Sequence, residues 1–142
     1  MNSESTIVAS WLYSTLAGDA QLMAAAPGGV WEDLAPAGTA LPVIIFHIEP
    51  AGAVAVLPVV RIASDFDCTV KAVVAGWSAA PLEPLASRIE ALLHRAGATG
   101  GPPAGPGILS CVRDQPLRYL EDADGNIYRH LGGQYHIQAQ EA

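Results

Sequence analysis

Residues 66–77, FDCTVKAVVAGW, followed by residues 81–93, PLEPLASRIEALL, decide the fold. Apolar and polar side chains alternate along the first stretch, which is typical of a strand with one face on the core. The apolar positions are Phe66, Cys68, Val70, Ala72 and Val74, and the polar ones are Asp67, Thr69 and Lys71. In the second stretch, leucines and an isoleucine recur at helical spacing behind Pro81, which suits a first helical turn. Gly97 suits the left-handed conformation that caps many helix C-termini.

Upstream of this unit, the sequence predicts two short helices. An apolar stripe over residues 7–16 indicates a first helix, which Ser3 or Ser5 can cap and which ends at Gly18. Asp19 can cap a second, shorter helix, which a Pro-Gly-Gly run then stops.

Extended segments are expected between the helices. Residues 30–34 are expected to be a short extended segment. Residues 41–49 form a nearly continuous β-rich run that predicts a buried strand, and a turn is expected at residues 50–52. Residues 53–62 are interpreted as a further strand, in which Pro58 marks a break, a bulge or an edge.

The C-terminal part predicts a loop and a strand pair. Residues 97–107, GATGGPPAGPG, are interpreted as a mobile surface loop. Extended segments are expected at residues 108–120 and 127–140, joined by a turn at residues 122–126. A β-bulge is expected at Gly132-Gly133.

This order of elements predicts an α+β fold. Hairpin-paired strands and a few helices form two layers, with a mostly antiparallel sheet and the helices packed on one of its faces. A chain of 142 residues is expected to form one domain, residues 1–142, with a flexible Gly/Pro loop at residues 97–107.

Composition indicates assembly with other chains. Seven Lys and Arg stand against fourteen Asp and Glu, for a formal net charge of −7. Such a chain lacks the basic stripe that grips nucleic acid, and it is repelled by an anionic membrane surface. Charged residues make up only 15% of the chain, against about 25% in a typical soluble domain. We expect apolar surface that a partner subunit covers, and an acidic lining would suit a channel through which DNA slides.

Targeting and cysteine patterns are unremarkable. Cys68 and Cys111 form no CxxC pair and are interpreted as small buried hydrophobic side chains. The N-terminal residues 1–6 do not resemble a secretion signal, and the apolar stretch at residues 51–60 is too short to span a bilayer. We expect a protein that is cytoplasmic at synthesis and has no membrane partner.

The motifs of the chain predict no enzymatic activity, no cofactor and no metal. The glycine-rich stretch lacks the Lys-Ser or Lys-Thr of a phosphate-binding loop, and residues 122–133 lack the Gly and Glu of a calcium loop. No serine lies in a GxSxG elbow. Metal-ligand spacing is absent around the four histidines, His47, His94, His130 and His136. Carboxylates that could in principle converge on Mg²⁺ are Asp65, Asp67, Glu121, Asp122 and Asp124, but turns and a solvated strand face explain them as well.

Three arginines are candidates for a subunit interface. Arg113, Arg118 and Arg129 lie on the expected final strand pair of an otherwise acidic chain, where they could pair with carboxylates of a neighbouring subunit. The simpler alternative is that they are solvated surface charges, and both interpretations stay open.

The chain resembles the tail terminator, or tail-completion, proteins of long-tailed phages and related tail-like particles. The resemblance rests on the order of short segments over nearly the whole chain and on the total length. These segments are LAGDA at 16–20, VWED at 30–33, ALPVIIF at 40–46, CTVKAVV at 68–74, ASRIEALL at 86–93, GNIY at 125–128 and LGGQYHI at 131–137. The Gly/Pro loop and the strongly apolar stretch at residues 51–60 depart from the family pattern.

The resemblance implies a ring, usually a hexamer, that works by binding and steric capping. The ring would bind the end of a finished tail tube, stop its growth and offer a surface to head-completion proteins. It would sit at the tail–neck junction of the virion and leave a central hole through which DNA passes without specific binding. Two alternatives stay open: a head–tail connector or minor tail protein elsewhere in the particle, and a small cytoplasmic ligand-binding module or hydrolase.

Overall fold

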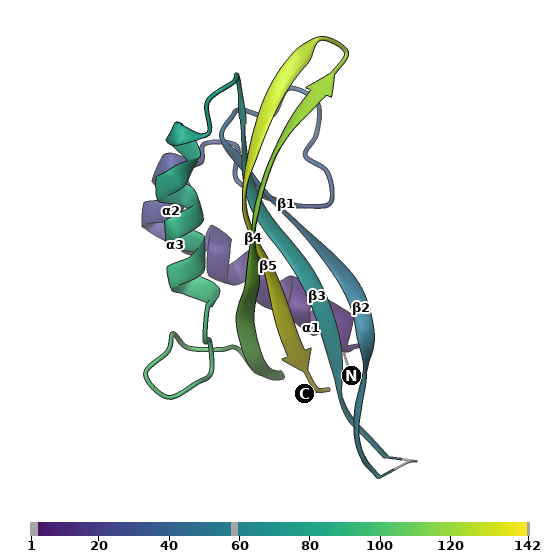
Figure 1. Ribbon diagram of the computed structural model, residues 1–142. Coiled ribbons are helices and arrows are strands. Elements are labelled where there is room, and N and C mark those ends of the chain that lie inside the picture. Colours follow the sequence, from purple (N-terminus) through teal and green to yellow (C-terminus); the bar gives the residue numbers. More distant parts are fainter. Residues whose placement is uncertain (1–2, 58–59, 142) are drawn as a thin grey trace.

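The computed structural model describes residues 3–57 and 60–141, in which a five-stranded sheet carries the helices on one face (Figure 1). The strands lie in the order β1-β2-β3-β5-β4. The elements are α1 (Glu4–Ala17), α2 (Ala20–Ala25), β1 (Val30–Glu32), β2 (Val43–Leu57), β3 (Val60–Ala75), the 3-10 turn η1 (Ala80–Leu82), α3 (Glu83–Leu93), β4 (Ile108–Ala123) and β5 (Asn126–Ala139). Only β1 and β2 pair in parallel, so the α+β prediction of a mostly antiparallel sheet with helices on one face is confirmed.

Two long hairpins form most of the sheet. β2 pairs with β3 and β4 pairs with β5, and the hairpins are joined where β3 pairs with β5. The C-terminal end of β2 and the β4–β5 turn lie at opposite ends of the sheet (Figure 1). The expected turn between the last two strands is confirmed, since Asp122 Oδ1 accepts a hydrogen bond from the Gly125 amide at 3.0 Å.

The core lies between the helices and one face of the sheet. The apolar positions that the alternation of β3 predicts face the helices, and Phe66, Cys68, Val70 and Ala72 are at most 4% exposed. The predicted apolar faces of two helices fill the other side of this layer. Their buried side chains are Ile7, Val8, Trp11, Leu12 and Leu16 on α1 and Leu85, Ile89 and Leu93 on α3. Each large side chain buried in this way contributes about 1.5–3 kcal/mol.

Side-chain caps begin the first two helices, as the sequence predicts. Ser3 Oγ accepts a hydrogen bond from the Thr6 amide at 3.3 Å, and an Asp19 carboxylate oxygen accepts one from the Leu22 amide at 2.9 Å. Asp19 also receives two hydrogen bonds from Arg88 of α3, at 2.9 and 2.6 Å. The Arg88 guanidinium holds the pKa of the Asp19 carboxyl below its ordinary value, so this ion pair ties α2 to α3.

The expected cap of α3 at Gly97 is wrong. The helix ends at Leu93, with His94 as an extended C-cap residue. The chain then turns toward β4, where the Arg95 amide donates a hydrogen bond to the Cys111 carbonyl at 2.8 Å. Gly97 has the expected positive φ of 84°, but it lies in the loop that follows.

The expected turn at residues 50–52 is a β-bulge. β2 continues through this point, and its register with β3 shifts between Pro50 and Gly52. One extra residue on β2 bends the strand without ending it. The strand expected over residues 53–62 is therefore the end of β2 and the start of β3, and Pro58 lies outside the described residues.

The bulge expected at Gly132 and Gly133 is also wrong. Both glycines keep an unbroken register with β3 and with β4, and the register shifts of this hairpin lie elsewhere on β4. A Cβ at Gly132 would lie 2.1 Å from the Val70 carbonyl oxygen and 2.6 Å from Lys71 Cα. Gly132 is therefore required by the close approach of the β3 and β5 backbones.

The Gly/Pro loop packs against α1. Residues 97–107 contain no helix or strand, as predicted. A Cβ on Gly105 would lie 2.8 Å from Trp11 Cδ1, and one on Gly107 would lie 2.9 Å from Ile7 Cγ2. The missing side chains let the loop backbone lie directly against the helix, and the mobility of the loop stays a prediction.

Gly132→Ala is predicted to lower the free energy of unfolding by about 1–3 kcal/mol, because the β3 and β5 backbones must move apart to admit a methyl group. Gly133→Ala is the matched control, since a Cβ there first meets the flexible Arg113 side chain, at 2.9 Å from Nε. Urea unfolding followed by circular dichroism measures both values. Equal losses for the two variants would contradict the close-approach explanation.

Candidate interaction surface

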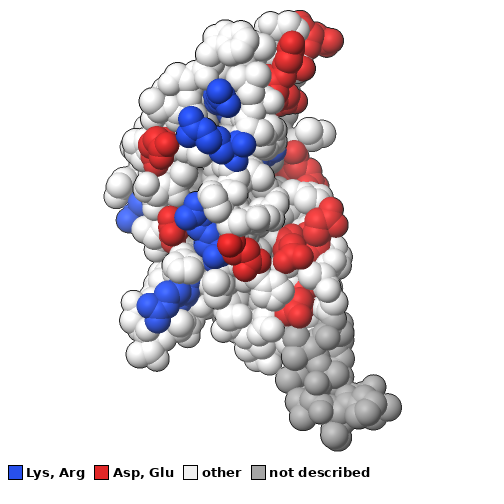
Figure 2. Space-filling view, viewed as in Figure 1, with Lys and Arg blue, Asp and Glu red and all other residues white. Residues whose placement is uncertain are grey.

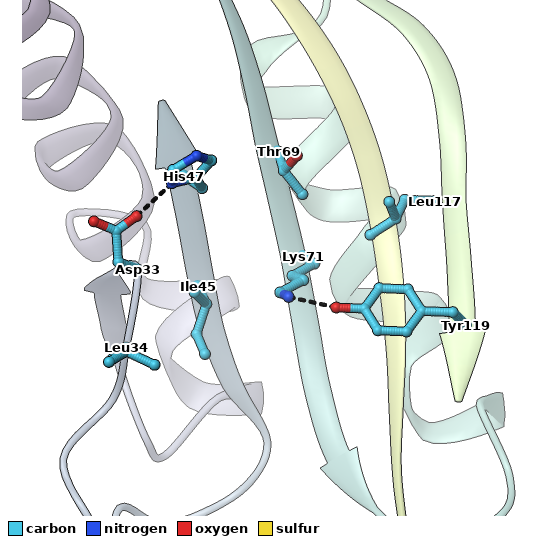
Figure 3. Close-up of a pocket in the computed structure, with 8 residues that line it drawn as sticks. All are labelled: Asp33, Leu34, Ile45, His47, Thr69, Lys71, Leu117 and Tyr119. Atoms are coloured by element: carbon cyan, nitrogen blue, oxygen red, sulfur yellow. Dashed lines mark hydrogen bonds and ion pairs between the residues drawn. The ribbon is translucent and has the colours of Figure 1, made fainter. Parts of the chain in front are cut away.

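The sheet face opposite the helices forms a shallow depression of about 500 Å³ (Figure 3). Ile45 of β2 and Leu117 of β4 give it an apolar lining, and Leu34, which follows β1, is 81% exposed beside them. The lining residues are Asp33, Leu34, Ile45, His47, Thr69, Lys71, Leu117 and Tyr119. The depression spans β2, β3 and β4, so it depends on the assembled sheet.

A lysine, a tyrosine and a histidine interact along one side of this depression. Lys71 Nζ donates a hydrogen bond to the Tyr119 hydroxyl at 2.6 Å (Figure 3). The Tyr119 ring stacks on His130, with centroids 4.2 Å apart. Glu121 contacts His130 Nε2 at 2.8 Å, but burial has the larger effect and lowers the pKa of His130. His130 is therefore mainly neutral at pH 7.

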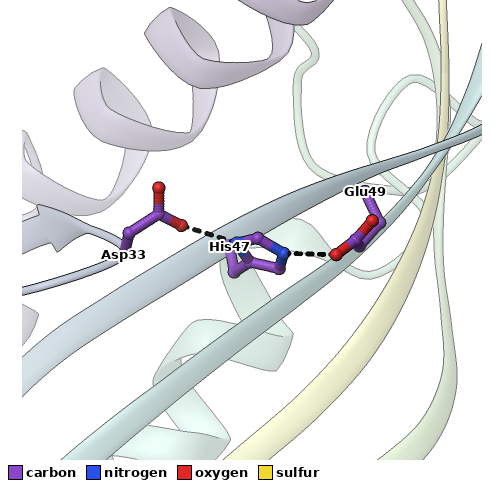
Figure 4. Close-up of polar contacts among 3 residues, drawn as sticks. All are labelled: Asp33, His47 and Glu49. Carbon is purple, nitrogen blue, oxygen red and sulfur yellow. Dashed lines mark hydrogen bonds and ion pairs between the residues drawn. The ribbon is translucent and has the colours of Figure 1, made fainter.

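His47 lies between two carboxylates on the same face (Figure 4). Its Nδ1 is 2.6 Å from Asp33 Oδ1, and its Nε2 is 2.7 Å from Glu49 Oε1. These hydrogen bonds, with Glu49 first and Asp33 second, raise the pKa of His47. The doubly hydrogen-bonded ring ties Asp33, the residue after β1, to β2.

His136 of β5 has a similar environment. Its Nδ1 is 3.1 Å from Asp67 Oδ1, and its Nε2 is 3.3 Å from Asp65 Oδ1. The hydrogen bond with Asp67 is the main cause that raises the pKa of His136. Asp67, Asp114 and His136 also bring ligand atoms within 4.8 Å of one another. The geometry explains these residues as an acidic cluster that hydrogen-bonds one histidine.

The carboxylates that the sequence grouped as possible Mg²⁺ ligands do not converge. Asp65 and Asp67 lie beside His136 of β5. Glu121 instead pairs with Tyr128, which lies eight residues before His136 on β5. At about 3.3 Å per residue, that separates the two groups by roughly 26 Å. Asp122 instead accepts a hydrogen bond in the hairpin turn.

The two histidine bridges could not be predicted from local sequence. Asp33 and His47 are fourteen residues apart and meet only because β1 pairs beside β2. A signal was present in the strand pattern, since His47 and Glu49 are two residues apart and share a strand face. Asp65 and Asp67 show the same spacing on β3.

The three candidate interface arginines lie on the helix side of the final strand pair. Arg113 and Arg118 approach α3 carboxylates at 3.2 and 3.7 Å, respectively. Arg129 Nε donates a hydrogen bond to the Trp77 carbonyl at 2.8 Å. Figure 2 shows basic side chains gathered over the α3 and β4 side and acidic ones along the opposite side and at one tip. A role for the arginines at a subunit interface stays a proposal.

Both cysteines are buried free thiols, which confirms their interpretation as small core side chains. Burial raises the pKa of Cys68 to about 12 and also raises that of Cys111. Neither thiol is a reactive nucleophile, because the thiolate is the reactive form. Among the described residues, no helix is both long and apolar enough to cross a membrane.

Comparison with known proteins gives a likeness in fold. No family model matches the chain, and no curated protein matches it. The structure is similar to a chain of the virion of a native gene transfer agent particle, with a TM-score of 0.63 and 12% sequence identity. The similarity covers 98% of this chain and 100% of that chain. The two chains therefore share their fold over their full length.

The three sheet histidines are predicted to titrate differently. By NMR, His47 and His136 should show pKa values above about 6.5 and His130 a value below it, because carboxylates hold the first two charged and burial disfavours the charge on the third. The bridges of His47 and His136 therefore stabilise the fold fully below pH 6.5, and this contribution disappears as pH rises through their folded pKa values.

Replacing each histidine in turn with Asn assigns its NMR resonance and provides the control for the pH dependence of stability. His47→Asn should remove one high-pKa resonance and reduce the loss of stability between about pH 6 and 8. If the His47 resonance titrates with an unshifted pKa of about 6.5, the bridges do not form in solution.

Proposed function

We propose that this chain is a structural subunit of a phage-type virion and acts there as the tail terminator. The observation that carries the proposal is the full-length likeness in fold to a chain of a gene transfer agent virion. The order of short sequence segments that resembles tail terminator proteins supports the finer assignment. In this role the chain forms a ring, usually of six copies, that caps the tail tube and joins it to head-completion proteins.

The surface chemistry supports assembly over catalysis. Large apolar side chains are exposed: Trp77 is 70% exposed, Leu34 81% and Tyr13 54%. Leu34 also lies beside Ile45 and Leu117 at the depression, and an exposed apolar surface of this kind is characteristic of one that a partner covers. Among the described residues, the polar clusters of the open sheet face place two or more carboxylates around each of His47 and His136, so they are net acidic, and they include no nucleophile beside a base. The ring therefore works through shape and contact.

The charge distribution supports passage of DNA. On the open face, Lys71 is bound to a tyrosine, and carboxylates surround both bridged histidines. A surface with this balance offers few free cations to phosphate groups, so DNA could slide past it without being held. In the proposed ring, the open face lines the central hole.

Deleting the gene for this chain is expected to give particles with tails of irregular length and heads that lack tails. Electron microscopy measures both, and a plasmid copy of the wild-type gene should restore uniform, joined particles. Normal virions without the gene would exclude a terminator. Immunogold labelling of wild-type particles should mark the tail–neck junction, whereas a label elsewhere would favour a connector or a minor tail protein.

A further inference from the structure

The sheet ends in two free edges that face opposite sides of the molecule. β1 pairs with β2 only from Ile44 to Phe46, so residues 47–57 of β2 have no strand on their outer side among the described residues. The segment after α3 covers the other edge only as far as Arg113, whose amide donates a hydrogen bond to His94 Nδ1 at 3.1 Å. Residues 114–123 of β4 are then free. Unpaired strand edges of this length are templates for pairing with another chain.

Apolar side chains are exposed along both edge strands, and Tyr119 and Leu120 lie within the free part of β4. The described residues expose eight large hydrophobic side chains, and six of them lie on β4 or at β1. Those on β4 are Leu109, Val112, Tyr119 and Leu120, and those at β1 are Trp31 and Leu34. An interface needs an apolar centre of this kind.

We propose that the free edge of β4 docks against the free edge of β2 on a second copy of this chain. This inference rests on the proposed ring and names its contact. β2 and β4 run in opposite directions in the sheet, since each step from β2 to β3, β5 and β4 is antiparallel. Subunits related by a ring axis keep the same direction along it, so the two edges meet in antiparallel orientation. The free segments also have nearly the same length.

The position of the edges constrains the ring. The free part of β4 lies toward the β4–β5 turn and that of β2 is its C-terminal part, so the two lie at opposite ends of the sheet (Figure 1). Pairing them displaces the neighbour along the strands. A closed ring then requires strands inclined to the ring axis, as in a β-barrel. Without this inclination, the same contact would build an open filament.

A charge pair fits this contact on the helix side of the sheet. The Arg118 side chain of β4 is 57% exposed. Its Nη1 lies 3.7 Å from Glu83 Oε1, which is long for an ion pair. Next to the β2 edge, a groove of about 350 Å³ lies between α1 and the sheet, and Glu32 is the charged residue that lines it. The groove residues are Ser5, Thr6, Ala9, Ser10, Glu32, Ile48 and Pro50. With Arg118 of one copy opposite Pro50 of the next, residues 114–121 pair with residues 47–54, and Arg118 lies four positions, about 13 Å, along the edge from Glu32, within reach of the two side chains on the helix face.

Proline limits how far the edges can pair. Pro50 lies on the β2 edge and Pro116 on the β4 edge, and neither can donate a backbone hydrogen bond. Each also lies close to a register shift of its own strand. These features protect the free chain against indiscriminate pairing. Side-chain contacts such as Arg118 with Glu32 therefore set the partner and the register.

Charge reversal tests the contact. Arg118→Glu and Glu32→Lys should each raise the concentration at which rings form by at least about tenfold, because each places like charges together. The double variant should return it to near the wild-type value. Arg95→Glu is the matched control, with the same change of charge on an exposed side chain away from the free edge. Analytical ultracentrifugation and negative-stain microscopy follow assembly, on isolated tail tubes if the free chain is monomeric.

Hydrogen exchange gives a second readout on the wild-type chain. Amides of residues 47–54 and 114–121 should exchange more slowly in the ring than in the monomer. Rings that form normally with Arg118→Glu, that are not rescued in the double variant, or that leave both segments unprotected would overturn this inference while the proposed function stands. A wild-type chain that forms rings neither alone nor on tubes would overturn both.

Discussion

The pairing of β3 with β5 holds the rest of the molecule together. An isolated two-stranded hairpin is marginally stable in water, and this chain contains two long ones. Only where β3 lies beside β5 do they form one apolar face wide enough for α1 and α3. The contact is so close at Gly132 that the Val70 carbonyl would lie 2.1 Å from any Cβ. A single missing side chain thus allows the sheet to form.

The sequence predicts most of this architecture because local patterns determine it. Alternation along β3 and the apolar stripes of α1 and α3 identify the buried faces, and the caps at Ser3 and Asp19 identify helix starts. The errors at residues 50–52 and at Gly132 have one cause. Pro and Gly were interpreted as turns or bulges from local propensity, whereas pairing with the neighbouring strand decides whether a strand continues.

The surface was less predictable than the core. The arginines Arg113, Arg118 and Arg129 were singled out by charge contrast, and they lie together on one side of the sheet. The sequence could not show that α3 carboxylates and a backbone carbonyl already engage them, because those partners are distant in sequence. The bridges of His47 and His136 were missed for the same reason. The two sides of the sheet consequently differ in chemistry, with arginines beside the helices and carboxylate-bridged histidines on the bare side.

The state of the two thiols has a practical consequence. Cys68 and Cys111 are shielded from solvent and held protonated, so maleimide dyes would leave the native protein unmodified. A cysteine introduced at any exposed position would then carry a fluorophore or spin label alone, with no need to replace the native pair. Distances between labelled subunits could be followed by energy transfer in an otherwise unaltered chain.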